Sequence, residues 1–324
     1  FDYGPHIFHS ADEEITNFFR EHCSDLLLEK EFFYKNYKEG QLYDYPISWD
    51  SIEKFPTKIK QKVIDEVSNL KPENLKRARN FKECVVELVG PTLQSIFFEK
   101  YTEKLWGIPP EKMSADWAPN RIELRKKDKA FWTGQFSACG KYGAGPVMER
   151  FADLAKINGV KFHLGHLVTE LKTVDNCITN ICFANGKVID VSNSIVVSTI
   201  PLVYLCDLLD IPCDLMFNSI RFVYLIMDKS KALPEGVHSI YFAHDNVHFY
   251  CVSEQKQYSD SGYPDDKTLL IFEVSCTVRK DLDKMSEEQI VGEVLDQFCG
   301  LGFVEKQDFI KGFTRKKPYV NPIM

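Results

Sequence analysis

Two arginines in apolar surroundings are the side chains of this sequence best suited to hold a phosphate-bearing ligand. Arg121 follows the segment 117–120, and Arg221 lies between Ile220 and Phe222. A guanidinium presents paired N–H donors whose geometry matches the oxygens of a diphosphate. The same residue types would also form an ion pair at a domain boundary. We therefore expect Arg121 and Arg221 either to bind a diphosphate or to serve as structural ion pairs.

A short turn near the N-terminus, Gly4-Pro5-His6, could bring the backbone close to a flat ring system. Glycine has no Cβ and reaches conformations closed to other residues, while proline fixes its own φ. The alternative is a plain turn at a strand end with a hydrogen-bonded histidine, because Gly-Pro pairs are common in turns. The turn is a candidate contact for a planar cofactor.

Other reactive patterns have little support. The sequence contains no GxSxG, P-loop or HExxH pattern, which disfavours the common hydrolase and kinase chemistries. Three histidine pairs each lack a suitable third ligand nearby, so we expect no metal site. These pairs are His6 and His9, His163 and His166, and His244 and His248.

The composition indicates a multi-domain globular protein. The chain has 324 residues, 44% of them hydrophobic, which is too much for one ordinary core. A net charge of −7 disfavours nucleic acid as a partner. Ten cysteines without a CxxC pair fit reduced thiols in the cytoplasm, and no apolar run reaches the roughly 18 residues of a membrane span. Because the chain opens at Phe1 without Met and stops at Met324 without a polar tail, we expect a fragment.

The first third of the chain predicts a helix, a hairpin and a helical block. Ser10 and Glu13 have the spacing of a capping box at a helix start, and Ile15, Phe18 and Phe19 would form one apolar face of that helix.

A β-hairpin is predicted within residues 26–47, with its turn at Glu39-Gly40. Residues 51–106 carry apolar side chains at helical spacing and predict a helical domain, which Gly90-Pro91 divides.

Residues 142–164 predict a helix followed by a strand. The helix would begin at Gly145-Pro146, turn Met148 inward and end at Asn158-Gly159. The strand is indicated by the alternation of Val160, Phe162 and Leu164.

Residues 178–210 continue with a hairpin, a strand and a helix. Asn185-Gly186 between two apolar runs predicts a hairpin with a type I′ turn. The run Ile195–Val197 is typical of a parallel strand buried on both faces, and Pro201 would begin a leucine-rich helix.

Strands dominate the sequence beyond residue 211. They are expected at Ile220–Met227, Ser239–Phe242, Val247–Val252 and Leu269–Val274. One helix interrupts them, with Ser286 and Gln289 as a capping box and its end near Gly300.

Three stretches resemble a known group of flavoproteins. Tyr3–His9 carries a GPHIFH segment that resembles UDP-galactopyranose mutases and their relatives in the amine-oxidase and protoporphyrinogen-oxidase superfamily. Phe98–Gly107 with Pro109 is similar to the YTxKxWG-x-P of the helical domain in that group. The run Gly143–Pro201, ending in STIP, looks like the second FAD-binding portion of the superfamily.

The resemblance implies an α/β fold with three parts. An FAD-binding Rossmann-like domain would take residues 1–22 and 141–210, and a helical domain residues 51–135. A mostly antiparallel substrate-binding sheet would take residues 23–50 and 211–324. The GxGxxG turn that holds the FAD pyrophosphate would lie upstream, since this sequence contains none.

The resemblance also implies roles for single residues. Gly4, Pro5 and His6 would lie beside the isoalloxazine ring, and the main chain of Val168 would contact the adenine. Thr199 and Pro201 end the expected buried strand, where ligands of α/β sheets gather. Arg121 and Arg221 correspond to arginines that serve the nucleotide substrate of the mutases. Tyr319 lies near the place of a Tyr-Pro pair in the family, where this chain has Asn321 before Pro322.

Three functions follow, in order of preference. The first is an FAD-dependent oxidoreductase whose flavin accepts a hydride from a substrate bound between domains. The second is a flavin-dependent isomerase like UDP-galactopyranose mutase, acting on a nucleotide sugar. The third is a non-catalytic remnant that kept the fold.

Overall fold

The computed structural model describes the chain except for residues 1, 117, 121 and 324, and it leaves the side chains of residues 72 and 120 undescribed. The chain divides into two compact units. Unit 1 comprises Phe1–Arg150 and Asn218–Asn321, and unit 2 comprises Phe151–Phe217 and Pro322–Met324. The three-part division by function expected above stays a prediction.

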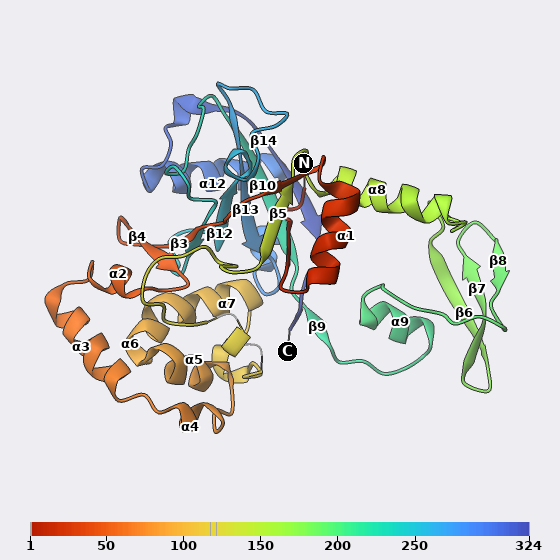
Figure 1. The fold of residues 1–324 in the computed structure, drawn as a ribbon, viewed down its shortest axis with the longest axis horizontal. Coiled ribbons are helices and arrows are strands. Elements are labelled where there is room, and N and C mark those ends of the chain that lie inside the picture. The colour runs from red at the N-terminus through yellow and green to blue at the C-terminus, as the bar shows by residue number, and fades with distance from the viewer. Residues whose placement is uncertain (1, 117, 121, 324) are drawn as a thin grey trace. The chain divides into compact units, whose positions relative to one another are not determined.

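A seven-stranded sheet forms the centre of unit 1 (Figure 1). Neighbouring strands are antiparallel except for β11 and β3, which pair in parallel. Across the sheet the order is β14 (Phe309–Lys317), β10 (Ile220–Met227), β13 (Thr268–Ser275), β12 (Cys251–Glu254), β11 (Ser239–Phe242), β3 (Tyr34–Lys38) and β4 (Gln41–Tyr45). The strands expected beyond residue 211 are therefore confirmed, although β12 begins later than predicted.

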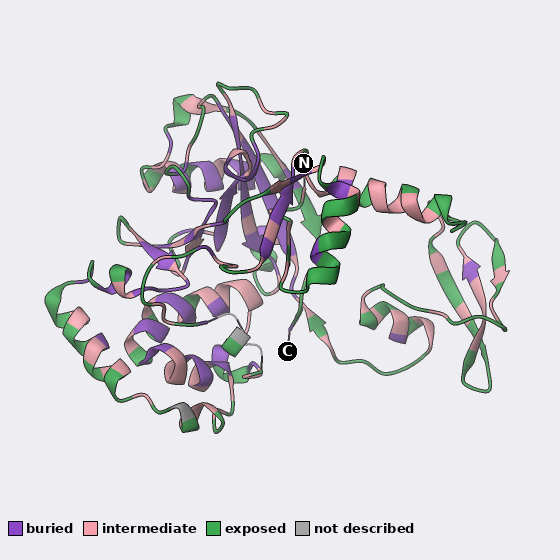
Figure 2. Ribbon diagram, viewed as in Figure 1, coloured by how far each residue is buried: buried purple, intermediate pink, exposed green. Residues whose placement is uncertain are grey.

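The two faces of this sheet differ in what covers them. One face packs against α12 (Glu287–Gly300) through an apolar cluster that includes Val223, Phe272 and Phe298. The other face carries Phe222 and Tyr250 and meets side chains of the helical block. The buried residues of unit 1 gather along these central strands, as Figure 2 shows. The capping box at Ser286, with Gln289 as its second member, is confirmed at the start of α12.

Local sequence determines the hairpin at one edge of this sheet. Glu39 and Gly40 both have positive φ, 49° and 84°, and join β3 to β4. Such values match the twist of paired strands in a two-residue turn, so the hairpin expected at Glu39-Gly40 is confirmed.

The helical block of residues 49–106 is also confirmed. Its apolar cluster includes Val63, Phe81 and Phe97, and Gly90, with a φ of 89°, separates two helices as expected. The helices are α2 (Trp49–Ile52), α3 (Thr57–Ser68), α4 (Pro72–Leu75), α5 (Phe81–Val89), α6 (Pro91–Leu93), the π-helical η1 (Gln94–Glu99) and α7 (Lys100–Trp106). Short 3₁₀ turns follow at η2 (Pro110–Lys112) and η3 (Ala118–Asn120).

A second sheet of unit 1 has the order β1 (Ile7–Ser10), β5 (Phe136–Gly140) and β2 (Leu27–Glu29). Along the chain, α1 (Glu13–Cys23) follows β1, and α8 (Ala144–Ile157) follows β5. The N-cap of α1 is Asp12 rather than the expected Ser10, because the Asp12 carboxylate accepts from the amides of Glu14 and Ile15. The apolar face predicted for this helix is exposed at Ile15 and Phe18.

Three further elements complete unit 1. These are α10 (Gln255–Tyr258), α11 (Lys280–Lys284) and the 3₁₀ turn η4 (Lys306–Asp308). No helix among the described residues is long and apolar enough to cross a membrane.

Among the described residues, unit 2 holds the second half of α8, a small antiparallel sheet and a short helix. The sheet has the order β6 (Val168–Val174), β7 (Cys177–Phe183) and β8 (Val188–Asp190), and the helix α9 (Leu202–Leu208) follows Pro201 as predicted. Strands β9 (Met216–Phe217) and β15 (Pro322–Ile323) pair separately.

Several expectations for unit 2 and for α8 are corrected. The hairpin at Asn185-Gly186 forms, but only Gly186 has positive φ, so its turn is not type I′. The segments 160–164 and 195–197 form no strand, and Ile195 is 94% exposed. A strand buried on both faces needs a hydrogen-bonded neighbour on each edge, and no such pairing occurs among the described residues there. In α8, Met148 is exposed rather than inward, and Val147 is the buried residue.

Candidate functional site

The Gly4-Pro5-His6 turn lies over the face of the seven-stranded sheet that is turned away from α12. Gly4 is buried with a φ of 80°, and a Cβ there would lie 3.2 Å from Oε1 of Glu273 and 3.6 Å from the ring of Phe222. The hydroxyl of Tyr224 donates to the carbonyl oxygen of Asp2 at 2.9 Å. Glycine is therefore required at position 4 both by its backbone conformation and by the sheet side chains beneath it.

A cavity of about 280 Å³ opens beside this turn. Pro5 and His6 line it from the turn, and the connection between β5 and α8 lines it from another side. The exposed imidazole of His6 lies 3.2 Å, through Nδ1, from the carbonyl oxygen of Gly4. The remaining lining residues are Asp2, Cys139, Gly140, Lys141, Tyr142, Gly143, Gln255, Tyr258, Ser259, Ser261, Gly262 and Tyr263.

The connection between β5 and α8 is a tight glycine-rich turn. A Cβ on Gly140 would lie 2.0 Å from the carbonyl oxygen of Gly143, so only glycine fits there. The carboxylate of Asp2 accepts from the amide of Ala144 at 2.9 Å and thereby caps the first turn of α8. The N-terminal segment and the β5–α8 turn are thus joined at the cavity.

Cys139 lines the cavity but is poorly suited to act as a nucleophile. Burial raises the pKa of its thiol to about 11, and the thiol donates to the carbonyl oxygen of Tyr258 at 3.2 Å. A nucleophilic cysteine requires its thiolate, which this environment disfavours.

Glu273, on β13, is a carboxyl group set into an aromatic surface. The hydroxyl of Tyr250 donates to its Oε2 at 2.5 Å. Tyr250 packs edge to face against Tyr101 of α7, with ring centroids 6.1 Å apart. Burial raises the pKa of Glu273 although the hydrogen bond from Tyr250 opposes this effect.

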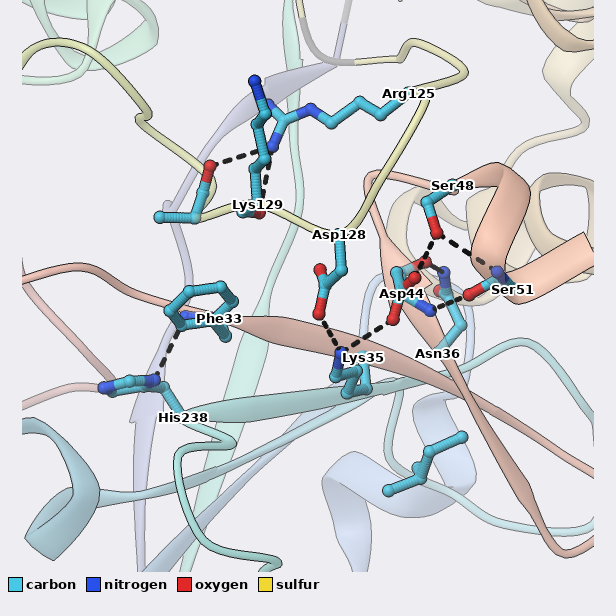
Figure 3. A network of polar contacts seen from close by, with 12 residues as sticks. Phe33, Lys35, Asn36, Asp44, Ser48, Ser51, Arg125, Asp128, Lys129 and His238 are labelled. Carbon is cyan, nitrogen blue, oxygen red and sulfur yellow. Dashed lines mark hydrogen bonds and ion pairs between the residues drawn. The ribbon is translucent and has the colours of Figure 1, made fainter.

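A charged network holds β3 and β4 to the neighbouring loop (Figure 3). The ammonium of Lys35 lies 2.7 Å from Oδ1 of Asp44 and 2.6 Å from Oδ2 of Asp128. The second oxygen of Asp44 accepts from the hydroxyl of Ser48 at the start of α2. Burial raises the pKa of Asp44, but hydrogen bonds from Lys35 and Ser48 outweigh this and leave the pKa lowered. The network fixes the edge of the sheet from which the helical block begins.

Arg221 is placed on the opposite face of the sheet from the Gly4 turn. Its side chain is buried, and its guanidinium donates to the carbonyl oxygens of Leu282 at 3.1 Å, Met285 at 2.8 Å and Ser286 at 3.2 Å. It also donates to the hydroxyl of Thr314 at 3.3 Å. The structure therefore gives Arg221 a role in holding the α11–α12 connection and does not bring it to the cavity.

The remaining residues expected at the site belong to other parts of the chain. Val168 starts β6 in unit 2 and pairs with Phe183, while Thr199 is exposed in the same unit and Pro201 precedes α9. Tyr319 belongs to unit 1, follows β14 and is 40% exposed. Arg121 lies outside the described residues.

Sequence reasoning missed Glu273 and Tyr250. Both stand in apolar stretches that indicate strands, and the pairing of their side chains joins residues 23 positions apart. The single signal available was a glutamate inside the otherwise apolar run Leu269–Val274.

Two curated proteins are similar to this chain. The dTDP-fucopyranose mutase of Escherichia coli is 25% identical over 185 residues, which is 55% of this chain and 46% of that protein. A probable UDP-galactopyranose mutase of Klebsiella pneumoniae is 27% identical over 161 residues, 48% of this chain and 41% of that protein. The matches thus span less than half the length of either relative.

The fold is shared with a solved flavoenzyme. The crystal structure of reduced UDP-galactopyranose mutase superimposes with a TM-score of 0.81 at 17% identity, covering 100% of this chain and 72% of the other. At that identity the likeness shows the fold, a mixed α/β arrangement of several sheets. The sequence model of the flavin-containing amine oxidoreductases matches residues 1–314, nearly the whole chain, and the chain therefore belongs to that family.

Proposed function

We propose that this chain belongs to an FAD-dependent oxidoreductase whose small-molecule substrate is held between the helical block and the seven-stranded sheet. The observation that carries the proposal is the match of residues 1–314 to a flavin-containing family. The family assignment supports FAD as the cofactor. We further propose a cytoplasmic location, as the reduced cysteines suggest.

The residues around the Gly4 turn fit one part of such a cofactor. Ligand cavities commonly measure about 300–1,000 Å³, so the cavity of about 280 Å³ has room for a ring system rather than for the whole of FAD. Pro5 and His6 would contact the ring, and Lys141 would offer a donor to its carbonyl oxygens. When bound, the flavin supplies hydride transfer.

The second FAD-binding portion is proposed in unit 2. The main chain of Val168 at the start of β6 would contact the adenine, and Thr199 and Pro201 before α9 would contact the cofactor.

A second candidate function is a flavin-dependent mutase of a nucleotide sugar. The observation in its favour is that both curated relatives reported above carry mutase names. In this case Tyr319 would contact the nucleotide sugar, and Arg121 would bind its diphosphate.

Purification of the full-length protein tests the proposal. We expect FAD to copurify, and we expect either oxygen consumption with a primary amine or conversion of UDP-galactopyranose to the furanose with reduced flavin. The first result supports the oxidoreductase and the second the mutase. A folded protein that binds no FAD would support the non-catalytic reading instead.

A further inference from the structure

The seven-stranded sheet contains two buried or partly buried glutamates whose surroundings are opposite in kind. Glu254 is fully buried, and its two carboxylate oxygens accept from the amides of Ala232 and Leu233, both at 2.8 Å. Oε1 also accepts from the hydroxyl of Thr268 at 2.6 Å. Such a set of donors stabilises an ionised carboxylate and explains Glu254 as a structural residue.

Glu273 lacks this solvation. Among the described residues, one donor reaches its carboxyl group, the hydroxyl of Tyr250 at Oε2. The other oxygen, Oε1, faces the Gly4 turn, where it lies 3.2 Å from the position of an added Cβ. One oxygen is therefore fixed, and the other is directed at the segment that borders the cavity.

The titratable groups around Glu273 do not neutralise a negative charge on it. The tyrosines and the cysteine that interact with Glu273 are neutral, and burial raises the pKa of each of them. No ammonium or guanidinium is paired with the Glu273 carboxyl among the described residues. The neutral tyrosines and the neutral cysteine around Glu273 are Tyr250 and Cys251 beside β13, Tyr101 of α7 and Tyr224 of β10. Two further charged groups act on Tyr224, Asp2 of the N-terminal segment and Arg315 of β14.

We propose that Glu273 is the proton-exchange residue of this site, held by Tyr250 as its positioning residue, and that it acts on a substrate oxygen or nitrogen brought to the Gly4 turn. In the forward step the O–H bond at Oε1 breaks and an O–H or N–H bond forms on the substrate, leaving the carboxylate stabilised by Tyr250. The reverse step restores the acid. The inference rests on the proposed function, because it needs a substrate bound at this turn.

The geometry fits this role in two respects. Burial raises the pKa of Glu273, and a carboxyl group with a raised pKa keeps its proton to a higher pH than an ordinary glutamate does. The bond from Tyr250 leaves the proton on the oxygen that faces the turn, since Oε2 is already an acceptor.

Replacement by glutamine separates this role from a structural one. The pKa of Glu273 is raised in the folded state, so its protonated carboxyl group adds most to the free energy of unfolding below about pH 4, the usual range of glutamate. That contribution is lost as the pH rises towards the raised folded pKa. We therefore expect Glu273→Gln to have the same melting temperature as the wild type at low pH and a higher one at neutral pH. The matched variant Glu254→Gln should melt below the wild type at neutral pH, because an amide cannot accept from all the donors around it.

The kinetic test uses the full-length protein loaded with FAD, in whichever of the two assays above the wild type turns over. We expect Glu273→Gln to lower kcat by about 100-fold or more, with KM changed only a few-fold and FAD bound as in the wild type. Tyr250→Phe should shift the pH profile of kcat, while Glu254→Gln should leave kcat within a few-fold.

Two results would overturn the proposal alone. One is an unchanged kcat in folded, FAD-loaded Glu273→Gln, and the other is a melting-temperature difference from the wild type that does not vary with pH. A wild-type protein that binds no FAD, or that turns over in neither assay, would refute the proposed function and with it this inference. These outcomes are distinguishable because the melting curves require neither cofactor nor substrate.

Discussion

Arg221 and Phe222 are consecutive residues of β10 whose side chains lie on opposite faces of the seven-stranded sheet. Arg221 donates to the carbonyl oxygens that precede α12, whereas the ring of Phe222 lies beside Gly4. Because successive side chains of a strand alternate in direction, one residue of register decides which of the two side chains lies beneath the Gly4 turn.

We predict that Arg221→Met destabilises the fold by about 3 kcal/mol, because it removes the donors to several buried oxygens. The exposed Arg279, paired with Asp281 at 2.7 Å, is the control, and Arg279→Met should change stability by less than about 1 kcal/mol. Urea unfolding measures both. Titration of the folded Arg221→Met protein with UDP should give the wild-type affinity, and a large loss of affinity would return Arg221 to diphosphate binding.

Alanine at Gly4 tests the contact between the turn and the sheet. Gly4 and Gly40 have nearly the same φ, 80° and 84°, but only Gly4 has neighbours within reach of a Cβ. Both substitutions incur the strain of a left-handed alanine, about 1–2 kcal/mol. We expect Gly4→Ala to lose roughly 1 kcal/mol more, since Glu273 must also move. Equal losses of unfolding free energy in the two variants would show that the side chains beneath the turn can move aside without cost.

Lys35 should matter for stability far more than an exposed lysine. Lys35→Met leaves the buried carboxylate of Asp44 without its cation, and we expect a loss of about 3 kcal/mol at neutral pH. Lys60→Met, which removes an exposed pair with Glu53, should cost less than about 1 kcal/mol. The pKa of Asp44 is lowered in the fold, so its contribution is present above the usual aspartate range and is lost as the pH falls through the folded value. The difference between the wild type and Lys35→Met should therefore shrink on acidification.

The cysteines should divide sharply in their reaction with iodoacetamide. Cys177 and Cys213 are exposed, whereas Cys139 and Cys251 are buried and burial raises the pKa of both thiols. Brief labelling of the native protein near pH 7.5, followed by mass spectrometry, should modify the first pair and spare the second. Labelling in urea should modify all four. Rapid native labelling of Cys139 would contradict its assignment as an unreactive thiol.

Much of the fold could be predicted because its signals are local. The turn at Glu39-Gly40 requires two positive φ angles, and the box of Ser286 and Gln289 joins side chain to backbone within one helical turn. Apart from Arg221, the strand Ile220–Met227 carries apolar or aromatic side chains, because both of its faces are covered. Each of these patterns is decided by residues within a few positions of one another.

The failures have a physical cause in common. Ile195–Val197 and Val160–Leu164 have the residue types of strands, but a strand exists only when another backbone pairs with it. The apolar face of α1 is exposed at Ile15 and Phe18, because helical periodicity gives the direction of a face and not what covers it.

The candidate site could be predicted only in part for the same reason. The Gly4 turn is visible in the sequence because glycine and proline are distinctive. Glu273 becomes notable only when β13 is brought beneath that turn, through a contact that spans most of the chain.

The parallel pairing of β3 with β11 has a consequence for folding during synthesis of the chain. The amide of Phe33 donates to His238, 205 residues further along, and Tyr34–Tyr37 pair with Ser239–Phe242 at the same junction. During synthesis from the N-terminus, the β3–β4 hairpin emerges long before the strand against which it must dock. Its open edge is a template for pairing with other chains until then. The nascent chain should therefore depend most on chaperones while the ribosome synthesises the residues between β3 and β11. Chains that are terminated within that interval should aggregate rather than be degraded.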